Sequence, residues 1–453
     1  MLQKKKSKKG TFIALVCVVI LLAVIVLLEN VLDPTKNTML FTVLKKGAVY
    51  TLVATSMNLL NGFTGLFSLG QAGFMLLGAY TYAILTIPAA SRESIYYIYG
   101  GSIVNFSLPE VFGGGAVGLV LGVLVAIILA GCVAALIAWL IGIPVLRLKS
   151  DYLAIATLGF AEIIRAVFQW DKLGPLTNGA NALKTFPTFS SFNIQGANGQ
   201  VVLRLSTFVP FLLSAVCIGI IVLLINSSYG RAFKAIREDE IAAEAMGINL
   251  AKHKRLAFCI SSFFAGVGGA LFAMFANQAQ AKTFTTAMTY EILLIVVIGG
   301  IGSISGSAIA SFLYVAASEW WLRFLDSELV YPSPTAPGRM AFIVVFALIV
   351  AAVTVLVLRR EKKAGGPLWK KLLMLAVAVV LIGWDVYFAV SKTLKMPLLR
   401  NGFRMVVFSA IIMIVVLFFR RGIMGDRELS DLFRRKAAKP AAAVSGKEEA
   451  NHG

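Results

Sequence analysis

Long apolar runs separated by short polar segments recur along most of the chain. A helix needs about 20 apolar residues to cross a bilayer. No run shows the sustained alternation of apolar and polar positions that is typical of a transmembrane β-strand. The predicted fold class is therefore all-α, a polytopic transmembrane helical bundle of about 10 to 12 crossings. The runs that form crossings, or parts of crossings where glycine interrupts them, lie near 12–28, 40–60, 64–87, 116–142, 152–170, 206–226, 256–276, 288–299, 304–324, 340–358, 372–390 and 403–419.

Two of these runs are interrupted by glycine and polar residues. The first is FTGLFSLGQAGFMLLGAY, from Phe63 to Tyr80, and the second is IGGIGSISGSAIAS, from Ile298 to Ser311. Each is either a helix crowded by neighbours or a broken or re-entrant segment, whose backbone must then be covered by protein or a watery cavity. In our count of crossings both lie at the inner start of an outward-running crossing, which suggests a parallel internal repeat.

The composition agrees with a membrane protein, and the charge orients it. The chain is 58% hydrophobic and 14% charged, whereas soluble proteins carry about 25% charged residues. If the N-terminus is inside, the inner segments hold 27 of the 42 Lys and Arg residues, as expected because basic loops stay in the cytoplasm. The net charge of +20 therefore indicates orientation in a lipid membrane rather than nucleic-acid binding. Both termini are predicted to be cytoplasmic.

The sequence shows no candidate catalytic, metal or nucleotide site. Its four cysteines lie in apolar segments, and its two histidines stand in a basic loop and in the C-terminal tail. No phosphate-binding loop of the form G-x-x-x-x-G-K-[ST] occurs. We therefore expect no cofactor, no metal and no enzyme activity. If the chain takes part in ATP-driven work, a separate subunit must hydrolyse the ATP.

Few ionisable residues stand inside the predicted crossings. Glu162 and Arg165 lie three residues apart and can share one face of a helix, either as a structural pair or as part of an outer vestibule. Lys45, Lys46 and Glu291 lie near the outer ends of their crossings. The Glu162–Arg165 pair does not resemble a proton relay, which argues against an ion-driven transporter.

The longest inner loop, 227–255, contains a predicted short amphipathic helix. Acidic residues at positions 238–240 suit the first turn of a helix, and Gly247 suits the position that ends it. Small apolar side chains at 241, 242, 245 and 246 form one face. The helix is an ordinary connector, a lipid-surface helix or a docking element. Anionic lipid would repel Glu240 and Glu244, so a groove on a protein partner fits better.

Several motifs in this order resemble one family. EDEIAAEAMGINLAKHKRLAFCISSFFAGVGGAL, from Glu238, resembles the coupling region of permease subunits of ABC importers for branched-chain amino acids. SDYLAIATLGFAEIIRAVFQ, from Ser150, is similar to the signature of LivM-type permeases, whose companion permease is LivH, and LTNGANAL, from Leu176, resembles the outer loop that follows it. With the two glycine-interrupted runs, the resemblance covers most of residues 40 to 320. The ending VVLFFRRGIMG, from Val415, also matches.

The resemblance implies a permease subunit for Leu, Ile and Val in the cytoplasmic (inner) membrane of a prokaryote. Its implied partners are two ABC ATPase subunits, a second homologous LivH-like permease and a soluble substrate-binding protein, which would meet the outer loops 88–115 and 171–205. The implied ATPase contact is formed by Asp239, Glu240, Ala243, Glu244 and Gly247. With that contact in place, the predicted translocation pathway is lined by Ser68, Gln71, Gly73, Gly300, Ser303 and Ser305.

The implied domain organisation is a transmembrane permease domain over 1–425, with the coupling loop at 227–255, and a basic, disordered tail over 426–453. An extra helical hairpin near 330–400 departs from the family pattern, and is either a lineage-specific addition or a regulatory element. The sequence shows no convergent polar set that would bind a zwitterion. Other substrates of related permeases (urea, short amides or nucleosides) therefore stay open, as does an ATP-independent channel or secondary transporter.

Overall fold

The computed structural model of the chain describes residues 8–32, 37–148, 150–195, 201–321 and 422–425, with isolated positions between 351 and 383. Its internal contacts divide the chain into two units, Met1–Trp321 with Ser409–Gly453, and Leu322–Phe408. The second unit lies almost wholly outside the described residues. The same holds for the predicted hairpin at 330–400, the last three predicted crossings and the tail at 426–453.

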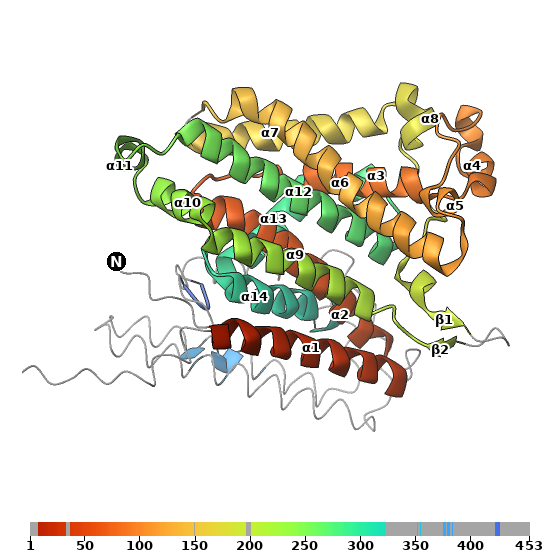
Figure 1. Ribbon diagram of the computed structural model, residues 1–453, viewed down its shortest axis with the longest axis horizontal. Helices are drawn as coiled ribbons and strands as arrows, with labels where there is room; N and C mark the ends of the chain where they lie inside the picture. The colour runs from red at the N-terminus through yellow and green to blue at the C-terminus, as the bar shows by residue number, and fades with distance from the viewer. Residues whose placement is uncertain are drawn as a thin grey trace, which may run out of the picture. The chain divides into compact units, whose positions relative to one another are not determined.

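The first unit is built mostly from helices (Figure 1). The 3-10 and π turns are labelled η, and the two short strands pair antiparallel with Ile194 opposite Leu203. The elements, in chain order, are α1 Lys8–Val31, α2 Thr38–Asn58, η1 Leu59–Phe63, α3 Gln71–Thr86, α4 Ala89–Ile95, η2 Tyr97–Tyr99, α5 Leu108–Val111, α6 Gly115–Val145, α7 Ser150–Gln169, η3 Asp171–Leu173, α8 Gly174–Thr177, η4 Phe189–Phe192, β1 Ile194–Gln195, β2 Val201–Leu203, α9 Phe208–Asn226, α10 Ser228–Glu238, α11 Glu240–Ala245, α12 Leu250–Ala276, η5 Ala281–Thr283, α13 Thr286–Gly299, α14 Ile304–Ala316 and η6 Ala317–Trp321.

Among the described residues, four helical segments are long and apolar enough to cross a membrane. They are α6, residues 152–169 of α7, α9 and α12. The α3–α4 pair would make a fifth span, bent by 120°. Val18–Val31 and Thr286–Gly299 are shorter apolar helices. The all-α membrane class and the presence of interrupted spans are confirmed.

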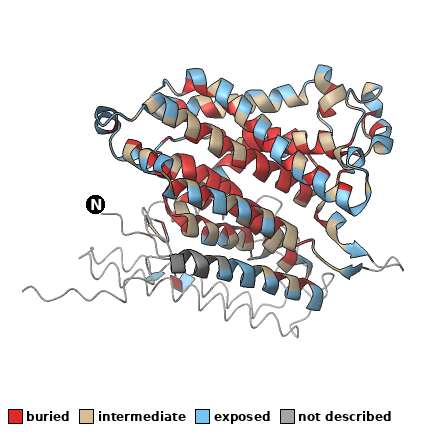
Figure 2. Ribbon diagram, viewed as in Figure 1, coloured by how far each residue is buried: buried red, intermediate tan, exposed pale blue. Residues whose placement is uncertain are grey.

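The core lies where α12 runs between α3, α6 and α2. The most apolar window of α12 is 78% buried, compared with 28% for α9. Figure 2 shows the buried residues gathered in α2, α3 and α12, whereas α1 is largely exposed. Exposed apolar faces on α1, α6, α7 and α9 suit contact with lipid, because lipid tails are as apolar as these side chains.

Glycines allow α3 and α12 to approach at backbone contact. A Cβ atom at Gly269 would lie 1.9 Å from the Met75 carbonyl oxygen, and one at Gly78 would lie 1.9 Å from the Gly266 carbonyl oxygen. Helices in lipid have no hydrophobic driving force for association. Small residues at their crossings instead allow close van der Waals packing, which stabilises the contact.

Gly269→Leu is expected to separate α12 from α3 and to reduce the amount of folded protein sharply, since overpacking costs about 1–3 kcal/mol or more. The measurement is the monodisperse fraction and melting temperature in detergent. Gly219→Leu is the matched control, because nothing lies within 4 Å of a Cβ at that helical position. Equal melting temperatures for the two variants would contradict the close packing.

The two ends of the bundle carry different loops. Figure 1 shows α10 and α11 at one end, and α4, α5, α8 and the two strands at the opposite end. The predicted outer loops 88–115 and 171–205 therefore lie at the end opposite the predicted inner loop 227–255. At that opposite end, Tyr96 joins the two outer loops through a 3.0 Å hydrogen bond from its hydroxyl to the Leu176 carbonyl.

Candidate functional site

The loop between α9 and α12 folds into two helices, where the sequence predicted one. At the start of α10, the Ser227 hydroxyl accepts a hydrogen bond from the Gly230 N–H. Phe233 and Ile236, three residues apart, are buried against the bundle. This spacing of two large apolar residues was the signal for α10 that the sequence prediction missed. α10 is thus a packed helix that carries α11 at its end.

Asp239 ends α10 and begins α11. Its backbone is extended, and its carboxylate accepts hydrogen bonds from the N–H groups of Ile241 at 2.9 Å and Ala242 at 3.1 Å. These bonds satisfy donors that a helix start leaves unpaired. Gly247 has φ +84°, and its N–H reaches the Glu244 carbonyl at 2.9 Å. This left-handed position is a common helix ending. The predicted end at Gly247 and an acidic start at Asp239 and Glu240 are confirmed, whereas Glu238 is the last residue of α10.

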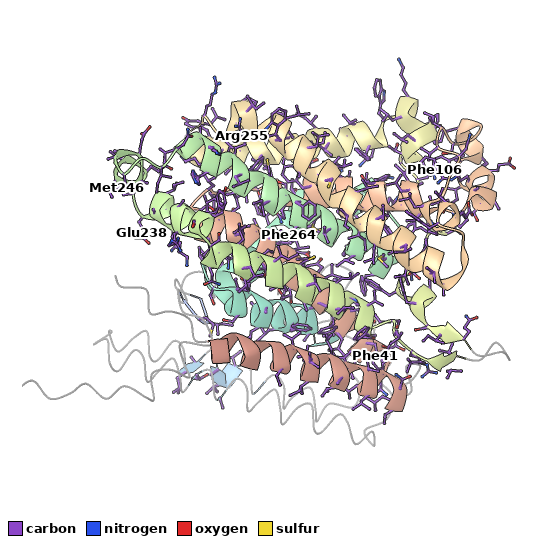
Figure 3. All side chains as sticks on the ribbon, in the orientation of Figure 1. Phe41, Phe106, Glu238, Met246, Arg255 and Phe264 are labelled. Carbon is purple, nitrogen blue, oxygen red and sulfur yellow. The ribbon has the colours of Figure 1, made fainter. Side chains whose placement is uncertain are left out.

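α11 presents apolar side chains to solvent at the tip of the bundle. Ile241 is 82% exposed and Met246 is 84% exposed, and Figure 3 shows Met246 at the far end from Phe106. Ala243 is buried, and Glu240 pairs with Lys254 at 2.6 Å. Of the predicted coupling residues, Asp239 caps the helix, Ala243 faces inward, and Glu240, Glu244 and Gly247 lie on the surface.

The first glycine-interrupted run is a true break in the helix. The π turn η1 is followed by a non-helical segment, 64–70, before α3 begins at Gln71. Gly65 has φ +76°. The Asn61 side chain bonds both the N–H and the carbonyl of Ser68, and Leu69 N–H donates to the Thr157 hydroxyl at 3.0 Å. These bonds replace the helical ladder, so the broken-segment interpretation is the correct one.

The second run is also a break, between α13 and α14. Gly300 and Gly302 have φ of +116° and +93°, conformations that only glycine adopts without strain. Ser303 then caps α14, since its hydroxyl accepts a hydrogen bond from Gly306 N–H at 3.1 Å. At the described positions 422–425, Ile423 N–H donates to Ile298 at 2.7 Å. This segment covers carbonyl groups that the end of α13 leaves unpaired.

Asn58 joins the two breaks. Its side-chain nitrogen donates to the Ser303 carbonyl at 2.9 Å and to the Ser307 hydroxyl at 2.8 Å, while its oxygen accepts from Gly302 N–H at 2.8 Å. The residue is fully buried. A buried polar network of this kind specifies one arrangement, because unpaired groups are costly at low dielectric. The sequence analysis did not single out Asn58, although an Asn inside an apolar run was a usable signal.

Arg237, at the end of α10, contacts the same two breaks. One of its terminal nitrogens donates to the Gly62 carbonyl at 2.7 Å. A Cβ at Gly302 would lie 2.8 Å from that nitrogen, and a Cβ at Gly65 would lie 3.3 Å from the Arg237 Cα. The helix that carries the exposed tip therefore rests directly on the interrupted spans.

The predicted pathway residues lie at or beside the two breaks. Ser68 and Gln71 are buried, and the Gln71 amide donates to the Ser56 hydroxyl at 2.6 Å. Gly73 packs against Ala161 of α7. At the second break, Gly300 packs against Gly425, Ser303 is buried as the cap of α14, and Ser305 is half-buried.

The ionisable residues that the sequence placed inside the crossings form polar contacts near the end of the bundle opposite α11. Arg165 pairs with Glu162, with a 2.7 Å bond from Nε to Oε2. Lys46 pairs with Glu319. Lys45 donates to the Ser206 hydroxyl at 2.6 Å.

The described residues contain no group of three or more His, Cys, Asp or Glu side chains that could hold a metal ion.

Comparisons with known proteins identify relatives of this arrangement. LivM proteins of Salmonella typhimurium and Escherichia coli, described as high-affinity branched-chain amino acid transport system permease proteins, are 31% and 32% identical over 301 and 304 residues. Each alignment covers 62% of this chain and 63% of the relative, so the chain spans less than two thirds of their length. A probable LivM of Methanocaldococcus jannaschii is 24% identical over 277 residues, 59% of this chain and 76% of that protein. No solved structure matches the chain.

The family model described as the permease component of branched-chain amino acid transport systems matches residues 39–353. This range contains both helix breaks, Asn58, α10 and α11. Because the match extends over more than half of the chain, the protein belongs to the branched-chain amino acid transport system permease family.

Proposed function

We propose that the chain is the membrane-spanning permease subunit of an ABC importer that moves leucine, isoleucine and valine across the cytoplasmic membrane of a prokaryote. The observation that carries this proposal is the connection between the exposed α11 tip and the two broken spans through Arg237. A channel or facilitator would have no use for a projecting helix joined to its interrupted spans. An importer driven by separate ATPase subunits needs such a connection.

The α11 end of the bundle faces the cytoplasm in this proposal. Apolar Ile241 and Met246, with acidic Glu240 and Glu244 beside them, fit a groove on an ATPase subunit better than a membrane surface, because acidic side chains are repelled by anionic lipid. The proposed ATPase contact comprises Asp239, Glu240, Glu244 and Gly247 at the surface, with Ala243 packed beneath them. In this proposal both termini are cytoplasmic.

A movement of α11 is transmitted to the spans through α10, because α10 packs directly against the bundle. Phe233 and Ile236 pack α10 against the bundle, and Arg237 donates a hydrogen bond to the Gly62 carbonyl. Displacement of α10 therefore changes the first break, and Asn58 passes the change to the second. Ligand-driven change requires contacts that differ between two states, and short glycine-rich breaks are segments that can take two backbone arrangements. Ser68, Gln71, Gly73, Gly300, Ser303 and Ser305 border the path that opens there.

The remaining partners are proposed from membership of the family. A second, homologous LivH-like permease completes the pair, two ATPases hydrolyse ATP, and a soluble binding protein docks on the outer loops. Leucine, isoleucine and valine are proposed because the relatives' printed descriptions name branched-chain amino acid transport. Urea, short amides and nucleosides are the alternative substrates.

The test is co-purification and uptake with the full complex. This chain should purify with two ATPases and a second permease, and leucine uptake into cells should require the ATPases. Purified chain that transports leucine alone in liposomes would contradict the proposal and favour a facilitator. ATP-driven uptake of urea or a nucleoside, with no uptake of leucine, would keep the importer and replace its substrate.

A further inference from the structure

We propose that the end of the bundle opposite α11 holds a binding site for a small carboxylic acid with an apolar side chain, and that Lys45 binds its carboxylate. The inference deepens the proposed function and rests on it for one point, the identification of the ligand as an apolar amino acid on its way to the translocation path. The cavity and its chemistry are independent of that point.

The site is a cavity of about 250 Å³ between the start of α2, the 3-10 turn η4 and the end of α12. Pockets for drug-sized ligands are about 300–1,000 Å³, so this volume suits a smaller molecule. Figure 3 shows Phe41, which lines the cavity, at the end of the bundle opposite Met246. η4 belongs to the outer loop 171–205, where the proposed binding protein docks.

The cavity has an apolar floor and a polar mouth. Phe41, Phe189 and Met274 line it and are buried. Thr38 and Ser190 line it and are exposed. An apolar floor stabilises a ligand that removes apolar surface from water. Urea has no such surface, so among the substrates of related permeases the lining favours an amino acid with an apolar side chain.

Lys45 lines the cavity and is placed to bind an anion. Its ammonium donates to the neutral hydroxyl of Ser206 at 2.6 Å. An ammonium group has three donors, and this bond uses one of them. The neighbouring Glu29 accepts from Ser206 Oγ at 2.5 Å and from the Thr207 N–H at 2.9 Å, so its carboxylate is held at the start of α9. The rival interpretation is that Lys45 only anchors α2 to α9 and α1.

The experiment measures equilibrium binding of radiolabelled leucine to the full complex in nanodiscs, without binding protein or ATP. Lys45→Gln should weaken leucine binding about tenfold or more, because it removes a hydrogen bond between charged groups, while Lys45→Arg should stay close to wild type. Leucinol, which lacks the carboxylate, should bind wild type and Lys45→Gln equally weakly. Thr38→Trp at the exposed mouth should block leucine without disturbing the core.

The outcomes separate this inference from the proposed function. Wild-type leucine affinity in both Lys45→Gln and Thr38→Trp, with ATP-driven leucine uptake intact, would overturn the site and leave the importer standing. Equal loss of leucine and leucinol binding in Lys45→Gln would show a structural anchor and overturn the carboxylate role. If Lys45→Gln does not assemble, Thr38→Trp decides the matter, and normal binding in that variant overturns the site. A complex that imports no leucine but binds it in a Lys45-dependent way would retain the site and refute leucine as the imported substrate.

Discussion

Arg237→Gln is expected to lower ATP-driven import about tenfold or more while the complex assembles and hydrolyses ATP. The guanidinium donates to the Gly62 carbonyl at the first break and lies against Gly302 of the second. A hydrogen bond from a charged donor contributes about 1.5–3 kcal/mol, and about 1.4 kcal/mol corresponds to tenfold in an equilibrium. Without this hydrogen bond, α10 can move with the ATPase while the broken spans keep their conformation.

The measurement is the number of leucine molecules imported per ATP hydrolysed, in proteoliposomes that contain the whole complex. Arg231→Gln is the matched control, since Arg231 lies on the same helix and bonds only locally to Ser228 in the contacts described. Arg231→Gln should keep the wild-type ratio. If Arg237→Gln also kept it, the connection from α10 to the breaks would be a passive packing contact.

The double substitution Ile241→Glu and Met246→Glu is expected to release the ATPases and abolish import. The two side chains are 82% and 84% exposed, so the change should leave the isolated permease folded. In a docked complex the same positions lose water contact, and burying two new carboxylates without partners is strongly unfavourable. The loss should therefore appear in assembly rather than in stability.

Co-purification of the ATPases with tagged permease measures this directly, and the melting temperature of the permease reports on its own fold. Ile241→Leu with Met246→Leu keeps the tip apolar and should retain both ATPases. Full retention of the ATPases by the glutamate variant would exclude α11 from the interface. A lowered melting temperature of the permease alone would show that the tip packs within the chain.

Sequence reasoning identified the secondary structure best where the pattern was local. The helical runs, the acidic start and Gly247 ending of α11, and the glycine-interrupted stretches all depend on neighbouring residues. Hydrophobic periodicity and helix-capping residues predict such features from the sequence, without knowledge of the fold. The motif order that resembles LivM-type permeases was equally visible, and residues 39–353 match that family.

Long-range polar contacts could not be read from the sequence. Asn58 and Ser303 are far apart in the chain. Arg237 lies in a predicted inner loop, where the positive-inside rule already accounts for a basic residue. Nothing near Gly62 marks it as an acceptor for that arginine. The same limit applies to Lys45, whose partner Ser206 lies far away in the chain, in the turn before α9.

The amino-acid sequence by itself determined the class of the protein: a helical membrane protein with two glycine-interrupted runs and a polar loop carrying a short helix, whose motifs resemble the branched-chain permease family. These follow from composition, periodicity and local motifs. Only the tertiary structure decided that the two breaks meet at Asn58, that α10 packs and places Arg237 on them, and that α11 stays exposed. The physical reason is that a buried polar group forms hydrogen bonds with whichever groups the fold brings close to it. The sequence indicates only that each such group needs a partner, not which partner it has.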